Sequence, residues 1–433
     1  MRSIRFTLVL LVFACAALIP TDASGQRKKK NPDTVFEKHP EVMQELGLSY
    51  GPFPFAHSTS DQVAEELMIT REVLWLQTPH FRIGSTLKKW KIPAPERKVY
   101  RAELTEFKKT YPEIDPKVST LDKWYRLHLY AWRMEKLYSE FLNHMGWTPE
   151  DFPKLPPEEI FAKAFEDEFT KTLNDFELDR GGQSRPPGFP NWVGMGQFLG
   201  EPNRFEIFLS QDEPTWQEFK LNYFGIKTAH PQRWNIKLDT VDDGVTQPRS
   251  RCLLFGISAE QAEVRHDQHM HNALRHNISI NFLDGYMLYL FDLPAWIREG
   301  YAHYMRRLNS KEYSFYDSGE GAAEIEKNAT EWAPIVRKLV RKEEAATFAH
   351  LSRLNDYVDL DFDSHLVVWS KIDFLVAIDN KKFGKFILSL KGQINGAGMA
   401  DAQRKAFKAI YGWSMRQAEE AWKVWVLENY STK

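Results

Sequence analysis

Hydrophobic residues recur at intervals of three and four between residues 120 and 145, the spacing of one face of an α-helix. Ser119 and Asp122 suit the start of this helix, and Gly146 suits its end. The apolar stripe consists of Trp124, Leu127, Ala131, Met134, Tyr138, Phe141 and Met145. A helix with one such face packs against a core, so this stretch is predicted to be structural.

Other stretches show either the helical spacing of three and four or the alternation of two that is typical of strands. Short apolar or alternating runs predict strands at 80–87, 205–209 and 253–257. The helical pattern predicts helices at 120–145, 212–223, 258–283, 293–305, 365–378, 383–390, 402–410 and 415–427, with a charged helical stretch at 322–345. Ser258 and Gln261 form a capping-box pattern at the start of the helix that carries His276. The chain is therefore predicted to be an α+β protein, mainly helical, with a small sheet and a helical C-terminal part.

The first 25 residues have the pattern of a secretory signal peptide. Arg2 and Arg5 precede an apolar run from Phe6 to Pro20, and Ala23-Ser24-Gly25 suits a cleavage site. An exported protein, periplasmic or extracellular, is predicted, with no transmembrane span once the signal is removed. A lipoprotein anchored at Cys15 is the alternative.

Composition narrows the classes of partner. Removal of the signal peptide leaves Cys252 as the single cysteine, so no intramolecular disulfide can form. The formal net charge of −2 argues against a nucleic acid partner, because phosphate binding requires a concentrated basic surface. Arg27-Lys28-Lys29-Lys30 is a charge run beside the cleavage site, and a solvated tail is its simplest interpretation.

Two predicted helices carry the candidate chemistry. The first contains His276, and the second contains the segment Pro294-Ala-Trp-Ile-Arg-Glu-Gly-Tyr-Ala-His-Tyr304. This segment resembles the PxWxxEGxAxY signature of a group of secreted bacterial gluzincin-like zinc metallopeptidases. In such enzymes an HExxH helix supplies two zinc-binding histidines and a general base, and a later helix supplies a glutamate. The resemblance implies that His276 and Glu299, which lies 23 residues further along, occupy the first and third ligand positions.

The HExxH motif itself is degenerate. Asn277 stands at the position of the catalytic glutamate, and Ile280 stands at the position of the second histidine. An amide cannot take a proton from water, and an isoleucine cannot bind a metal. Ordinary zinc hydrolysis should therefore be lost, so whether the chain is an enzyme stays open.

A remodelled metal site is the alternative to a metal-free remnant. His303 lies four residues after Glu299 and so on the same helical face. His276, Glu299 and His303 would then form a set of two histidines and one carboxylate with an open position. In this alternative zinc is the cofactor. In the leading interpretation there is no cofactor, and the three residues are polar groups beneath the remains of a cleft.

The resemblance implies a gluzincin-like core at 201–310. The remaining divisions are a signal peptide at 1–25, an irregular and helical segment at 26–78, a strand-helix region with a Gly/Pro-rich loop at 79–200, and a helical region at 311–433. The leading hypothesis is an exported pseudo-peptidase that binds a peptide, a protein or a cell-envelope component, with Trp296, Tyr301 and Tyr304 as candidate binding residues. The alternatives are a metal-dependent hydrolase that uses the remodelled site and a purely structural envelope protein.

Overall fold

The computed structural model describes most of the chain after the predicted signal peptide. The described residues are 35–36, 39–56, 58–67, 72–152, 197–201, 203–227, 232–242, 245–260, 266–286, 293–311, 315–319, 322–325, 331–390 and 399–432. The signal peptide, Cys15 and most of the Gly/Pro-rich loop lie outside them. Residues Thr34–Lys433 form one unit by their contacts.

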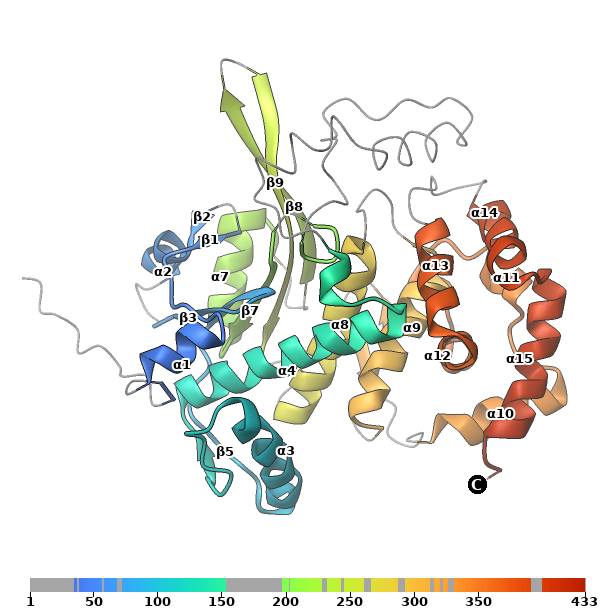
Figure 1. The fold of residues 1–433 in the computed structure, drawn as a ribbon, viewed down its shortest axis with the longest axis horizontal. Coiled ribbons are helices and arrows are strands. Elements are labelled where there is room, and N and C mark those ends of the chain that lie inside the picture. Colours follow the sequence, from blue (N-terminus) through green and yellow to red (C-terminus); the bar gives the residue numbers. More distant parts are fainter. Residues whose placement is uncertain are drawn as a thin grey trace, which may run out of the picture. The chain divides into compact units, whose positions relative to one another are not determined.

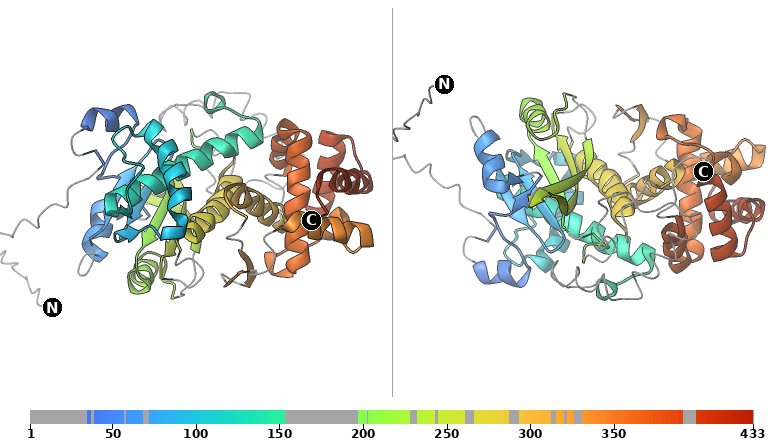
Figure 2. Two further views of the ribbon diagram at one scale, coloured as in Figure 1. Left: turned by 90° about the horizontal axis from the view of Figure 1, so that it is seen from below. Right: turned by 90° about the horizontal axis from the view of Figure 1, so that it is seen from above.

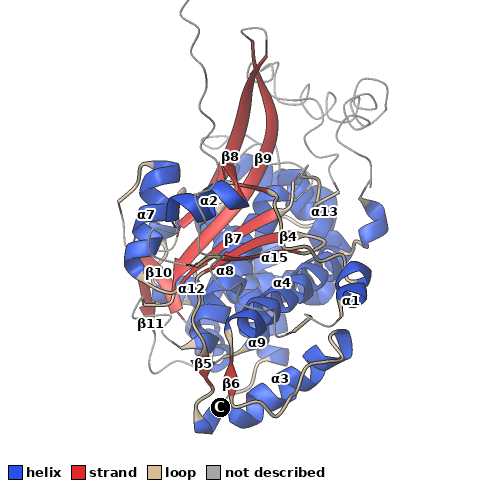
Figure 3. Ribbon diagram, turned by 90° about the vertical axis from the view of Figure 1, so that its left-hand side faces the viewer, coloured by secondary structure: helices blue, strands red, loops and turns tan. Residues whose placement is uncertain are grey.

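A five-stranded sheet forms one part of this unit (Figures 1 and 3). Its order is β3 (Leu74–Gln77), β4 (Phe81–Ser85), β7 (Phe205–Ser210), β9 (Val245–Ser258) and β8 (Gln232–Asp242). Strands β4, β7 and β9 are parallel, whereas β3 and β8 pair antiparallel to their neighbours. Strands β8 and β9 continue beyond the other strands as a two-stranded hairpin (Figure 1).

Helices cover both faces of the sheet, because alternate residues of each strand point to opposite sides. Ile83, Ile207 and Phe255 lie opposite one another on neighbouring strands and face α4 (Lys123–Met145) and α8 (Asp267–Gly285). Phe208 and Leu254 belong to a second cluster with α2 (Ser60–Leu67) and α7 (Glu213–Phe224).

Gly256 permits close packing on the α7 side. A Cβ atom at this position would lie 2.0 Å from the ring of Trp216, which is fully buried. The glycine therefore lets the indole of α7 lie flat against the sheet.

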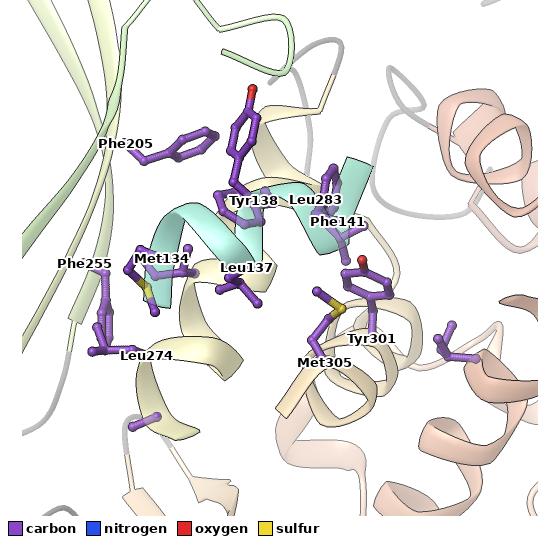
Figure 4. Close-up of a cluster of buried hydrophobic side chains, with 14 of the residues drawn as sticks. Met134, Leu137, Tyr138, Phe141, Phe205, Phe255, Leu274, Leu283, Tyr301 and Met305 are labelled. Carbon is purple, nitrogen blue, oxygen red and sulfur yellow. The ribbon is translucent and has the colours of Figure 1, made fainter. Parts of the chain in front are cut away.

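The main core lies where α4 crosses the sheet and α8 (Figure 4). The side chains labelled there come from α4, from strands β7 and β9, and from α8 and the helix that follows it: Met134, Leu137, Tyr138, Phe141, Phe205, Phe255, Leu274, Leu283, Tyr301 and Met305. All are nearly inaccessible to solvent. The predicted apolar stripe at 124–145 thus supplies the centre of this core, with Trp124 packed at its edge.

Local signals explain where α4 begins and ends. The side chain of Asp122 accepts a hydrogen bond from the Tyr125 backbone N–H, and Gly146 ends the helix with φ of 72°. Residues 120–121, predicted to be helical, instead form β6 (Thr120–Leu121), which pairs with β5 (Trp90–Lys91). The helix α3 (Arg97–Thr110), absent from the sequence prediction, follows η1 (Ala94–Glu96).

The helix that carries His276 begins later than predicted. Ser258 is the last residue of β9, where it pairs with Ser210 of β7, and its Oγ accepts a hydrogen bond from the backbone N–H of Glu260. Helix α8 starts at Asp267, and residues 261–265 lie outside the described residues. The capping-box prediction at Ser258 was therefore wrong, because sheet pairing holds this residue in an extended conformation.

Helix α9 (Ala295–Asn309) connects the sheet-containing half to the C-terminal helices. These helices gather on the side of α9 away from the sheet (Figure 2). They are α10 (Trp332–Lys342), α11 (Phe348–Leu351), α12 (Phe362–Ile378), α13 (Asn380–Leu390), α14 (Met399–Ala406), the π-helix η5 (Phe407–Tyr411) and α15 (Met415–Asn429). The predicted helices at 365–378, 383–390 and 415–427 are confirmed. Part of the stretch at 322–345 is instead the strand β11 (Ala322–Ile325), paired with β10 (Phe315–Gly319).

Short elements complete the fold: α1 (Pro40–Glu45), β1 (Pro54–Phe55), β2 (Ser58–Thr59), η2 (Pro149–Asp151) and η4 (Tyr357–Asp359). The expected α+β architecture, mainly helical with a small sheet, is confirmed. Within the described ranges, every helix is too short or too polar to cross a membrane.

Candidate functional site

Three helices bring together four buried side chains. His276 lies on α8, Glu299 and His303 lie on successive turns of α9, and His365 lies in the first turns of α12. The exposed fractions are 0% for each histidine and 4% for Glu299. The pair on α9 shares a face because its members are four residues apart. The cluster is closed to bulk solvent.

The cluster contains two close contacts, and one residue of each contact lies on α9. His276 Nε2 lies 3.4 Å from Glu299 Oε2. His303 Nε2 lies 2.8 Å from His365 Nδ1, a hydrogen bond in which one imidazole N–H donates to the other ring. The rings of His276 and His303 are 5.2 Å apart, centroid to centroid. One ligand atom from each of Glu299, His303 and His365 lies within 4.8 Å of the others.

Burial and neighbouring charges shift the pKa values of Glu299, His303 and His365. Burial lowers the pKa of His303 well below its usual value, and the guanidinium of Arg306 lowers it further. Burial also lowers the pKa of His365 to about 4. Burial alone would raise the pKa of the Glu299 carboxyl, but its hydrogen bond and electrostatic attraction to His276 lower it to about 2. Neutral imidazoles beside an ionised carboxylate are the forms in which these side chains bind metals.

The donor set fits a metal ion. Two imidazoles and one carboxylate form a common zinc ligand set, in which neighbouring ligand atoms are roughly 3.3 Å apart at bond lengths of about 2.0–2.1 Å. The ligand atoms of Glu299, His303 and His365 lie within 4.8 Å of one another, and the two nitrogens of His303 and His365, 2.8 Å apart, would move apart slightly around an ion. His303 Nδ1 is buried without a hydrogen-bond partner among the described residues. A buried Glu299–His303–His365 group able to hold a metal ion is therefore present.

Trp332 and two arginines pack beside His303. The ring of Trp332 meets that of His303 edge to face, with centroids 5.2 Å apart. The guanidinium of Arg307 lies 4.1 Å from the centre of the same indole, and that of Arg306 lies 5.5 Å from it. The arginines that lie over Trp332 place positive charge near His303.

The side chains at the two substituted positions of the motif, Asn277 and Ile280, have structural contacts in place of metal chemistry. Asn277 Nδ2 donates a 3.0 Å hydrogen bond to the carbonyl oxygen of Ala273, one turn earlier on its own helix. Ile280 is 1% exposed. The position expected for a general base thus carries an amide bonded to the helix backbone, and the position of the second histidine is apolar.

The chain matches no family model, and no curated protein is significantly similar to it.

Of the predicted ligand residues, the structure places Glu299 and His303 in the three-residue group and His276 against the carboxylate of Glu299. His365 was absent from the sequence prediction. Its position before the apolar run Leu366-Val367-Val368 was the available signal, since a histidine in a buried helix requires a polar partner. No spacing rule connects it with His303, which is 62 residues away.

The predicted binding residues of α9 lie within the packing of the helices. Trp296 is fully buried, and its indole N–H donates a 2.7 Å hydrogen bond to Oε1 of Gln403 on α14. Tyr301 is also fully buried, between the rings of Phe141 and Phe383. Tyr304 is half-buried, with its ring 5.2 Å from that of His144. These aromatic residues hold α9 against its neighbours.

Gly300 explains how α9 and α12 approach closely enough for the cluster to form. A Cβ atom here would lie 2.6 Å from the carbonyl oxygen of Val368 and 2.8 Å from a side-chain carbon of Ile372, both on α12. The missing side chain therefore brings the helices together beside Glu299 and lets His303 reach His365.

Proposed function

We propose that this protein is an exported, gluzincin-like pseudo-peptidase that does not hydrolyse peptides and acts by binding a peptide, a protein or an envelope component. In this proposal zinc is bound by Glu299, His303 and His365 in a centre that is buried from bulk solvent. The bound ion would then hold α9, which carries Glu299 and His303, against α12, which carries His365. The resemblance of the α9 segment to secreted zinc metallopeptidases supports this origin.

One observation carries the proposal: the cluster is buried, and the position of the motif's general base holds the amide of Asn277. A catalytic zinc site keeps a coordination position open to water and substrate, with a carboxylate placed to take a proton from that water. Here the four side chains are at most 4% exposed, and Asn277 is hydrogen bonded to its own helix. A substrate in the solvent could not contact an ion bound in this position.

His276 has a supporting part in this proposal. Its Nε2 contacts Glu299 Oε2 at 3.4 Å, and an outer partner of this kind orients a carboxylate ligand and tunes its basicity. Zinc is favoured over magnesium or calcium because imidazole nitrogens suit zinc, whereas the other two ions prefer oxygen ligands.

A hydrolysis assay tests the proposed lack of activity. The purified mature protein, loaded with zinc, is incubated with a mixture of unstructured peptides, and products are followed by mass spectrometry. We expect cleavage no faster than in buffer, since Asn277 occupies the position of the general base and the proposed metal ligands are buried. Cleavage that stops with a chelator and in Glu299→Gln would contradict the proposal. It would support instead a hydrolase using His276, Glu299 and His303 with a base from elsewhere.

A further inference from the structure

A cavity of about 750 Å³ lies among η1, α3, α4, α8 and the end of α9. None of the four residues of the His/Glu cluster lines it. The volume is in the range of pockets that bind small ligands and short peptides. This cavity is therefore a separate place at which the protein could bind a partner.

Two ion pairs fix the register of the cavity wall. Asp267 of α8 pairs with Arg133 of α4 at 2.9 Å, and Arg275 of α8 pairs with Glu140 of α4 at 2.6 Å. His271 lies midway between the two α8 residues, and the cavity-lining Lys136 lies between the two α4 residues. His271 and Lys136 consequently face the cavity at the same level, between the two ion pairs.

His271 is a buried polar group with unused hydrogen-bonding capacity. It lines the cavity, is 3% exposed, and neither ring nitrogen has a hydrogen-bond partner among the described residues. Burial, followed by the charges of Arg133, Arg275 and Lys136, lowers the pKa of its imidazole well below the usual value. A buried imidazole without a hydrogen-bond partner destabilises the folded protein. A ligand that hydrogen bonds to this ring would remove that cost.

Lys136 supplies a cation beside this ring. The other lining cations have partners: Arg133 pairs with Glu103, Arg275 with Glu140, and Lys311 with Glu331. In the part of the chain that the structure describes, Lys136 forms no ion pair, and its ammonium lies 5.6 Å from the centre of the Trp132 ring. Its side chain is exposed and can turn toward an anion in the cavity.

The rest of the lining favours a ligand with one negative charge and apolar side chains. Val99 is 60% exposed and Leu308 is 51% exposed, so both offer apolar surface at the cavity. Glu96 Oε2 is buried without a hydrogen-bond partner among the described residues and can accept an N–H. The lining includes five glutamates and four lysines or arginines, a balance that disfavours multiply charged anions.

We propose that this cavity binds short apolar peptides that end in a free carboxylate. The terminal carboxylate lies between Lys136 and the His271 N–H, Glu96 accepts a peptide N–H, and the side chains pack on Val99 and Leu308. This inference rests on the proposed function and names the place and ligand class of its binding role.

Calorimetric titration of the mature protein with N-acetylated alanyl-alanyl-leucine tests the inference. We expect saturable binding by the wild type. The Lys136→Met and His271→Leu variants, and the tripeptide with an amidated C-terminus, should each bind about tenfold more weakly, because a charge-assisted hydrogen bond is lost. Lys338→Met, at an exposed site outside the cavity, is the matched control and should bind as the wild type does. Inorganic phosphate in tenfold excess should not compete.

Three results would overturn the inference: no binding to the wild type, equal affinity for the acid and the amide, or displacement by phosphate. Unchanged affinity in folded Lys136→Met would do the same. Cleavage of the tripeptide would contradict the proposed lack of hydrolysis, but it would not contradict binding of the tripeptide in the cavity. Absence of binding would contradict the cavity proposal alone, because the hydrolysis and zinc measurements do not depend on this cavity. The two proposals can therefore be refuted independently.

Discussion

Replacing Asp267 with asparagine is expected to destabilise the protein by about 3–5 kcal/mol at pH 7, because buried Arg126 loses its carboxylate and buried Arg133 keeps only that of Glu103. Asp267 is 2% exposed and lies at the start of α8. It accepts hydrogen bonds from Tyr100 on α3 at 2.5 Å and from Tyr130 on α4 at 2.6 Å. Arg133 lies 2.9 Å from its carboxylate. One side chain thus joins three helices.

The pH dependence of this effect has a defined sign. Burial alone would raise the pKa of Asp267, but Arg133, Arg126 and the two tyrosine hydroxyls lower it to about 2, below the usual 3.8. A depressed carboxyl pKa stabilises the folded state above about pH 4, and that contribution is lost as the pH falls through 2. The difference between the wild type and Asp267→Asn should therefore shrink in acid.

Urea unfolding at several pH values measures this effect, with Asp401→Asn as the matched control. Asp401 pairs with Arg404 and Lys405 on the surface, so its replacement should leave the unfolding midpoint unchanged. Equal midpoints for Asp267→Asn and Asp401→Asn would show that the buried network contributes little to stability.

Adding zinc to metal-stripped protein is expected to stabilise it by about 4 kcal/mol when free zinc is 1,000 times the Kd. The reason is that Glu299, His303 and His365 come from α9 and α12 and meet only in the folded chain. The thermal unfolding midpoint measured with and without zinc reports this effect. Magnesium is the control ion and should produce no shift, because it avoids imidazole ligands. Identical midpoints with and without zinc would argue against the centre.

Much of the helical frame could be predicted from sequence because its signals are local. The stripe from Leu127 to Met145, with Asp122 before it and Gly146 after it, contains all the information that sets the bounds of α4. The resemblance to zinc metallopeptidases predicts that His276 and Glu299 lie close together, and their nearest side-chain atoms are 3.4 Å apart.

The features that the sequence did not reveal depend on distant parts of the chain. His365 meets His303 through the packing of α9 against α12, which Gly300 permits. Ser258 satisfies a helix-start pattern, yet its pairing with Ser210 keeps it in a strand. Trp296 and Tyr301 occur in a segment that resembles an active-site motif, but their rings are buried between helices. In each case tertiary contacts override a local pattern.

The zinc content of His365→Ala beside that of His276→Ala tests the central claim most directly. Elemental mass spectrometry of the mature proteins, each equilibrated with micromolar zinc, should find about one zinc per chain in the wild type and almost none in His365→Ala. His276→Ala should retain zinc with a roughly 10–100-fold weaker affinity, as expected for an outer partner. His350→Ala, at an exposed histidine, should match the wild type. Zinc kept by His365→Ala and lost by His276→Ala would contradict the account and restore the metallopeptidase arrangement.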